Sequence, residues 1–146
     1  MSVPPGVFPC YKNQFAIGPA GEDTPTTPIA DMETFDPTFD NGIEKWRAFE
    51  HEGWESALMT AKSIKIAIEG KRNIGDPGND EVAGLAFKSG HDVERNFLWN
   101  LPSGSTVLFK NAIISVSNNG GGAATGVGPL KYEVHSNGKP VYTPAA

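Results

Sequence analysis

Alternation of apolar and polar residues is strongest at residues 63–69, where Ile64, Ile66 and Ile68 are separated by polar or small residues. A period of two places the three isoleucines on one face, which predicts a half-buried β-strand that starts near Met59. Similar short runs rich in β-branched and aromatic residues predict further strands. They are expected at residues 13–17, 29–35, 96–99, 106–109, 112–116 and 130–134, with a tight turn at residues 102–105.

One segment has the spacing of a helix instead. Asp76 can cap a helix N-terminus, and Pro77 suits the first helical position. The residues at 82, 85 and 86 are apolar and recur at helical spacing, and Gly90 can end the helix. The pattern therefore predicts a short α-helix over residues 77–89. The run 76–80 also suggests a calcium loop, but it lacks the later glutamate of an EF-hand, so helix capping is the simpler interpretation.

Residues 36–55 follow neither period and combine aromatic residues with carboxylates. A long loop between strands is expected here, and loops of this length are uncommon in compact domains unless they are functional or disordered. The aromatic content disfavours disorder. Two interpretations stand: the rings form a contact surface for another chain, or they roof the domain's own core. The candidate contact residues are Phe39, Trp46, Phe49, Glu50, Glu52 and Trp54.

The two ends of the chain differ from the predicted strands. Residues 1–11 and 139–146 are extended, proline-punctuated segments with few apolar residues. Such arms either fray or lie on a neighbouring molecule. Val7 and Phe8 in the first arm, and Val141 and Tyr142 in the second, are the candidate contact residues.

Composition narrows the class of protein. The 146 residues are most simply one domain, and Gly 17 and Pro 12 indicate many turns, which disfavours a helical bundle. A single cysteine, Cys10, excludes an internal disulfide and a cysteine-rich zinc site. No signal peptide and no run of about 18 apolar residues is present, so synthesis in a cytoplasm without a membrane span is expected. Together these features favour a mainly β, water-soluble domain.

Charge is distributed unevenly along the chain. Residues 1–60 hold ten acids and three bases, net −7, whereas residues 61–146 hold seven acids and nine bases, net +2. The two halves are complementary, either within one subunit or between copies. The chain lacks a cluster of Lys and Arg with interleaved aromatics, which disfavours direct binding of nucleic acid.

Candidate catalytic chemistry is sparse. His51 between Glu50 and Glu52 is a weak candidate for a metal or acid-base site, because adjacent residues on a strand or loop point in different directions. No nucleophile motif surrounds Cys10 or any serine. We therefore expect neither an enzyme nor a cofactor. One alternative is a β-sandwich module that binds carbohydrate or peptide on Trp46 and Trp54; a weaker one is an enzyme that uses Glu50 and Glu52.

The order and spacing of several short motifs resemble the tail tube (major tail) proteins of tailed bacteriophages, of the type found in phages of Gram-positive bacteria. The resemblance covers nearly the whole chain. Its motifs are Pro5-Gly6-Val7-Phe8-Pro9, Tyr11-Lys12-Asn13, Asp31-Met32-Glu33-Thr34-Phe35, Phe39-Asp40-Asn41-Gly42, Gly53-Trp54, Leu58-Met59-Thr60-Ala61-Lys62-Ser63, Gly70-Lys71-Arg72-Asn73, Gly75-Asp76-Pro77-Gly78-Asn79-Asp80 and Ser136-Asn137-Gly138-Lys139-Pro140-Val141-Tyr142-Thr143-Pro144.

This resemblance implies a β-sandwich or barrel-like subunit with one flanking helix, in a virion protein made in the host cytoplasm. Copies would form hexameric rings that stack into a tube, with the long loop and both arms at the contacts between subunits and rings. The implied partners are the protein itself, the tail initiator or baseplate, the tape measure protein and the tail terminator. Double-stranded DNA would pass through the lumen without specific binding, and no membrane partner is implied.

A channel for DNA should present few free cations to the phosphates. The acidic surplus of residues 1–60 supplies candidates for such a lining. Asp31 and Glu33, on a predicted strand, are the lumen-lining candidates, and their alternative role is that of ordinary solvent-facing strand residues.

Overall fold

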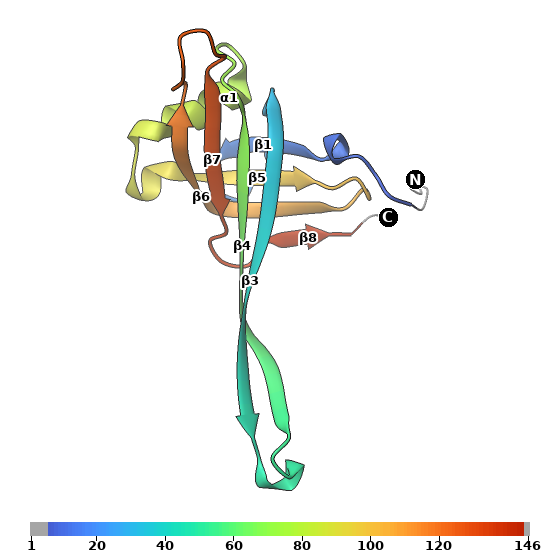
Figure 1. Ribbon diagram of the computed structural model, residues 1–146. Helices are drawn as coiled ribbons and strands as arrows, with labels where there is room; N and C mark the ends of the chain where they lie inside the picture. The colour runs from blue at the N-terminus through green and yellow to red at the C-terminus, as the bar shows by residue number, and fades with distance from the viewer. Residues whose placement is uncertain (1–5, 145–146) are drawn as a thin grey trace.

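The structure is a computed structural model and describes residues 6–144. Eight β-strands and one α-helix make up most of these residues, with short 3₁₀ helices between them (Figure 1). The strands are β1 (Gln14–Pro19), β2 (Thr27–Pro28), β3 (Met32–Arg47), β4 (Glu55–Lys71), β5 (Glu94–Asn100), β6 (Thr106–Asn119), β7 (Pro129–His135) and β8 (Val141–Thr143), and the helix is α1 (Pro77–Gly84). No helix in this part of the chain has the length and apolarity needed to cross a membrane.

All strand pairs are antiparallel, in the order β2-β1-β5-β6-β7-β4-β3, with β8 on the first half of β6. The sheet folds over because β6 serves both layers: its first half pairs with β5 and its second half with β7. Asn111, at the corner, has a left-handed backbone (φ 55°), which asparagine tolerates well. Its N–H donates to Oδ1 of the buried Asn96 at 3.0 Å. The corner thus turns one sheet into two packed layers.

The core lies between the layers. Ile66 and Ile68 of β4 are buried and Ile64 is partly buried, which confirms the face expected from their alternation. β7 repeats the pattern, with buried residues at alternate positions. The largest fully buried apolar side chains are Tyr132, Phe97, Phe109, Ile17, Ile66, Ile68, Ile114, Leu130, Val82 and Val134.

The predicted helix is present. α1 begins after Asp76, whose Oδ2 accepts the backbone N–H of Asn79 at 2.9 Å, and it continues as a 3₁₀ turn at Leu85–Phe87. The helix therefore ends two residues before the predicted position 89. Gly78 packs directly on β2, since a Cβ there would lie 2.1 Å from the carbonyl oxygen of Pro28. Val82 of α1 and Leu85 of the 3₁₀ turn are buried on the side that faces the sheet.

The predicted long loop at residues 36–55 is wrong as a description of the backbone. β3 pairs with β4 from Met32↔Gly70 to Arg47↔Glu55, so only residues 48–54 form the turn. This β-hairpin projects well away from the two layers (Figure 1). Both faces of its outer half are exposed. Apolar and polar residues therefore do not alternate along this part of the sequence, and the two-residue period of a strand cannot be detected there.

The C-terminal segment is also more structured than expected. Tyr142 pairs with Val107, so β8 is a strand of the sheet rather than a free arm over all of residues 139–146. The segments predicted as separate strands at 106–109 and 112–116 are one bent strand, β6. Residues 6–9 are extended or irregular and exposed, with a 3₁₀ turn at Cys10–Lys12. The remainder of the predicted arms, residues 1–5 and 145–146, lies outside the described residues.

Candidate assembly surfaces

Residues considered for catalysis lie at an exposed turn. His51 is at the hairpin tip, where its Nδ1 lies 2.9 Å from Ser56 Oγ. Glu50 and Glu52 flank it in the exposed turn, and neither forms an ion pair within residues 6–144. No group of three or more His, Cys, Asp or Glu side chains in the same range is placed to hold a metal ion. The geometry therefore offers no enclosed acid-base pair at these residues.

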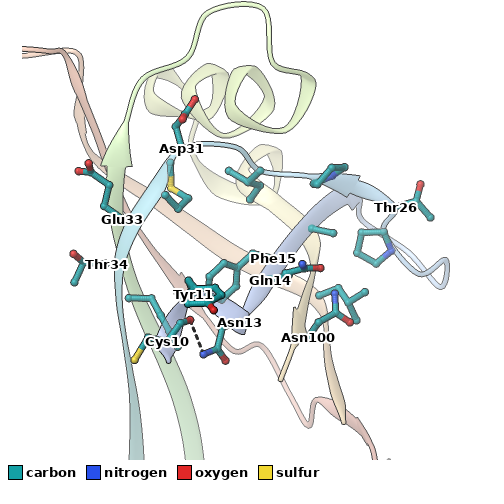
Figure 2. Close-up of a pocket in the computed structure, with 17 residues that line it drawn as sticks. Cys10, Tyr11, Asn13, Gln14, Phe15, Thr26, Asp31, Glu33, Thr34 and Asn100 are labelled. Atoms are coloured by element: carbon teal, nitrogen blue, oxygen red, sulfur yellow. Dashed lines mark hydrogen bonds between the residues drawn. The ribbon is translucent and has the colours of Figure 1, made fainter. Parts of the chain in front are cut away.

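A cleft of 930 Å³ opens between β1 and the start of β3 (Figure 2). Tyr11 and Phe15 line it from one side and Met32 and Phe35 from the other. The cleft lies where the two layers face each other without pairing, since β1 pairs with β2 and β5 and β3 pairs with β4. Phe15 and Phe35 meet in this region edge to face, with ring centroids 5.1 Å apart. We interpret the cleft as the open side of the two-layer fold.

The two lumen-lining candidates have different surroundings. Glu33 is the extra residue in the irregularity between Met32 and Thr34, and its Oε1 lies 2.9 Å from Lys71 Nζ. Asp31 precedes β3 with a left-handed backbone (φ 62°), and its Oδ2 accepts a hydrogen bond from Asn73 Nδ2 at 2.5 Å. Glu33 therefore belongs to the surface of the sheet, whereas Asp31 belongs to a structural network.

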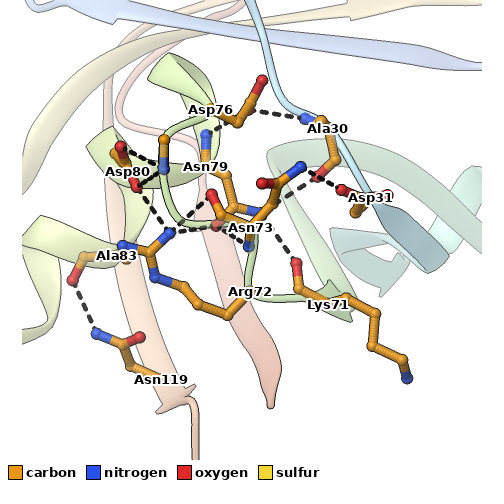
Figure 3. Close-up of polar contacts among 11 residues, drawn as sticks. Ala30, Asp31, Lys71, Arg72, Asn73, Asp76, Asn79, Asp80, Ala83 and Asn119 are labelled. Atoms are coloured by element: carbon orange, nitrogen blue, oxygen red, sulfur yellow. Dashed lines mark hydrogen bonds and ion pairs between the residues drawn. The ribbon is translucent and has the colours of Figure 1, made fainter. Parts of the chain in front are cut away.

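That network is centred on the fully buried Asn79 of α1 (Figure 3). Asn79 Oδ1 accepts hydrogen bonds from Arg72 Nη1 at 2.9 Å and from the Asn73 N–H at 3.0 Å. Its Nδ2 donates to the carbonyl oxygens of Ala30 and Lys71. Because every polar atom of the buried amide is satisfied, the network fixes the helix to the ends of β3 and β4.

The outer face of four strands, β3, β4, β7 and the second half of β6, is polar. On β7, Lys131, Glu133 and His135 alternate with buried residues and so point away from the core. On β4, Lys65 and Glu69 do the same. The polar residues of β3 and β6 on this face are Thr34, Asp36, Thr38, Asp40, Ser115 and Asn118, as the strand registers show.

Each lysine on this face is paired with a carboxylate. Lys65 Nζ lies 3.7 Å from Glu133, and Lys131 Nζ lies 3.5 Å from Glu69. The third pair is Lys71–Glu33. Exposed pairs of this kind add little stability. Their consequence is electrostatic, since Asp36 and Asp40 have no ion-pair partner within residues 6–144 and the face carries a surplus of negative charge.

The same four-stranded sheet ends in two open edges. Within the described residues, β3 pairs only with β4, and residues 114–119 of β6 pair only with β7. Open edges present unpaired N–H and C=O groups to a neighbouring strand. The sheet can therefore be extended on both sides by other strands.

The outer half of the hairpin exposes large apolar side chains on both faces. Ile43 lies opposite Met59 on one face, and Trp46 and Leu58 are diagonal neighbours on the other. Beyond them, Phe49 and Trp54 stand at the tip. Because the hairpin projects from the body of the subunit, the hydrophobic core of the subunit covers neither face of its outer half (Figure 1). The candidate residues Phe39, Trp46, Phe49 and Trp54 are all exposed, as are Val7, Phe8, Val141 and Tyr142 of the arms.

Comparisons identify the fold. No family model matches the sequence, and no curated protein sequence matches it. The structure is similar to a chain of the tail of an empty gene transfer agent particle, solved with C6 symmetry, with a TM-score of 0.73 at 15% identity over 94% of this chain and 99% of that chain. A chain of the native gene transfer agent virion gives a TM-score of 0.69 at 16% identity, over 94% of this chain and 99% of that chain.

A chain of the sheath-tube complex of an extracellular contractile injection system gives a TM-score of 0.63 at 11% identity, over 95% of this chain and 93% of that chain. The three similarities span nearly the full length of both partners. The mainly β fold with one short helix is therefore confirmed, and it is shared with chains of a gene transfer agent tail and of an injection-system sheath-tube complex.

Proposed function

We propose that this protein is the subunit of a tail tube, a structural virion protein without enzymatic activity. The observation that carries the proposal is the four-stranded sheet with a polar outer face and two open edges, set in the fold of tail and injection-system tube chains. An edge on each side allows each copy to pair with two neighbours. The polar face then forms one surface of a closed assembly.

Strand direction supports closure into a ring. The strands β6, β7, β4 and β3 alternate in direction, so the two edge strands run oppositely. A second copy rotated about an axis along the strands therefore presents its β6 edge antiparallel to the β3 edge of the first. Repetition of one rotation closes a ring, which removes the open edges. The C6 symmetry of the gene transfer agent tail supports six copies in each ring.

The polar face would line the lumen of this ring. Its lysines are paired with carboxylates and its remaining charges are acidic, so phosphates find few cations with which to exchange counterions. Double-stranded DNA would then pass without being held. Glu33 lies on this lining, and Asp31 lies beside it in the network that anchors α1.

Rings would stack through the projecting hairpin and the arms. Stacking joins unlike ends of the subunits, so it does not close and produces a filament. Further partners are proposed at the two ends of the tube and inside it: an initiator or baseplate, a terminator, and a tape measure protein. The contact residues proposed from the sequence are exposed and available for these interfaces.

Negative-stain electron microscopy of the concentrated purified protein tests the proposal. We expect hollow tubes of uniform width with sixfold cross-sections. A protein that stays monomeric at all concentrations contradicts the proposal and favours a binding module that uses Trp46 and Trp54.

A further inference from the structure

A second cleft, of 740 Å³, lies at the base of the hairpin. We call it the base cleft. Its wall is apolar and includes Phe39 of β3, Ile64 of β4, Trp99 of β5 and Tyr142 of β8. Trp99 and Val107, which also line it, are more than nine-tenths buried, so the floor is continuous with the core. An open apolar cleft of this size is a site that another apolar group can fill.

Two lysines give the base cleft a positive rim. Lys62 and Lys139 both line it. Lys62 Nζ lies 5.4 Å from the centre of the Phe39 ring and donates to Asn41 Oδ1 at 3.0 Å. Neither lysine forms an ion pair within residues 6–144. A fitting occupant therefore has aromatic side chains accompanied by carboxylates.

The hairpin tip has this composition. Phe49 is fully exposed and Trp54 is 78% exposed. Glu50 and Glu52 stand between them and have no ion-pair partner in the described part of the chain. The tip thus presents two uncovered rings and two unpaired carboxylates, which complement the apolar wall and the two lysines of the base cleft.

The tip cannot reach the base cleft of its own chain. Phe39 and Phe49 are separated by ten residues, most of them in a paired strand that rises about 3.3 Å per residue, so tip and cleft lie roughly 30 Å apart. Any occupant from the hairpin tip must come from a second copy. The hairpin extends along the strands of the four-stranded sheet (Figure 1). In a ring whose axis runs along these strands, as proposed above, that copy is displaced along the axis of the tube.

The N-terminal segment is another exposed apolar candidate. Val7 and Phe8 are exposed, but residues 6–13 contain no carboxylate and include Lys12. This segment would bring a third positive charge toward Lys62 and Lys139. Charge therefore favours the hairpin tip over the N-terminal segment.

We propose that the hairpin tip of one copy, residues 48–54, docks in the base cleft of a copy in the adjacent ring, with Glu50 and Glu52 facing Lys62 and Lys139. This inference rests on the proposed tube function and names the two surfaces that join successive rings. Phe49 and Trp54 supply the apolar contact, and the four charges set the register.

A charge-exchange experiment tests the pairing. Glu50→Lys with Glu52→Lys, and separately Lys62→Glu with Lys139→Glu, should each lower tube yield at low salt by about tenfold, because like charges would then face each other. The combination of all four changes should restore most of the yield. In the control, Lys62→Glu and Lys139→Glu are combined with Glu44→Lys and Asp92→Lys. This variant has the same net charge as the fourfold exchange, but its new lysines lie outside the hairpin tip and do not face the base cleft. Equal recovery in this control overturns the pairing.

Site-specific photo-crosslinking identifies the occupant directly. With p-benzoylphenylalanine at the position of Tyr142, irradiated tubes should yield a linked dimer, and trypsin should release a cross-link to the peptide of residues 48–62. A cross-link to residues 1–12 would mean that the N-terminal segment fills the cleft and would overturn the inference. If the wild-type protein forms tubes while the cross-link lies elsewhere, only the docking is wrong. If no tubes form, the proposed function itself fails.

Discussion

The inner and outer halves of the β3–β4 hairpin are the same pair of strands in two different environments. In the inner half, one face is buried in the core by Ile66 and Ile68 and the other is a polar surface with paired charges. In the outer half, both faces are exposed and carry large apolar side chains such as Ile43 and Leu58. An isolated two-stranded hairpin is only marginally stable. The inner half is stabilised by packing on the core of the subunit, and we expect the outer half to become ordered through contacts with other copies.

The largest expected difference between the halves is in the stability of the subunit. Ile66→Ala removes a fully buried side chain and should lower the free energy of unfolding by about 2–5 kcal/mol. Ile43→Ala, at an exposed position of the same hairpin, should change it by less than about 0.5 kcal/mol. Urea unfolding of the dilute protein measures both values. Similar losses in the two variants would mean that the outer half belongs to the folding unit.

Tube assembly, unlike subunit stability, should be more sensitive to changes in the outer part of the hairpin than to changes in the inner half. The double variant Phe49→Ala/Trp54→Ala should leave urea unfolding unchanged yet reduce tube yield at least about tenfold, since exposed aromatic anchors often dominate an interface. Phe87→Ala, which removes an equally exposed ring outside the hairpin, is the matched control. Quantitative electron microscopy at a fixed protein concentration provides the readout. Undiminished tubes in the double variant would place the tip outside the contacts.

The outward face of the inner half should control passage of DNA rather than folding or stacking. Glu69→Lys with Glu133→Lys removes the partners of Lys131 and Lys65 and adds two cations to the proposed lumen. Tubes should still form but retain short double-stranded DNA at low salt, with release as salt rises. The control variant, Glu81→Lys with Asp92→Lys, makes the same change in net charge at positions near α1. If both variants retain DNA equally, the polar face does not line the channel.

The smallest expected effect is on acid stability of the body. The hydrogen bond from Arg72 holds the pKa of Asp80 below its usual value of 3.8, with a further contribution from the Gly75 N–H. A carboxyl whose pKa is lower in the folded state stabilises the fold above its unfolded pKa, and this contribution is lost as pH falls through the folded value. Asp80→Asn should therefore flatten the decline in stability below about pH 4, as measured by thermal unfolding across pH. A pH profile of Asp80→Asn that matches the wild-type profile would remove Asp80 from this role.

Several parts of the fold could be predicted from local pattern. The spacing of Ile64, Ile66 and Ile68 placed one face of β4 correctly, because a strand packed on a core on one side must alternate. Asp76 and Pro77 located the start of α1, since capping needs only neighbouring residues. The expected turn at residues 102–105 is also present, with the Gly104 N–H bonded to the Leu101 carbonyl oxygen.

The sequence pattern failed where a strand is not packed on the chain's own core. The outer half of β3 has no buried face, so its residues alternate in no detectable way and were expected to be a loop. β8 has only three residues, and its pairing with β6 depends on a strand far away in the sequence. The strands predicted at residues 106–109 and 112–116 are a single strand, β6, which bends at Asn111.

The sequence alone determined the mainly β class, the capped helix and the motif order that resembles tail tube proteins, because these depend on neighbouring residues and their spacing. Only the tertiary structure decided which charges share a surface. It placed Glu33 with Lys71 on the outer face and Asp31 with Asn73 in the network of α1, although the two acids are two residues apart. It also brought Lys62 and Lys139 to one cleft. Such contacts are set by sheet register and strand order, which join residues distant in the chain and leave no local periodicity to detect.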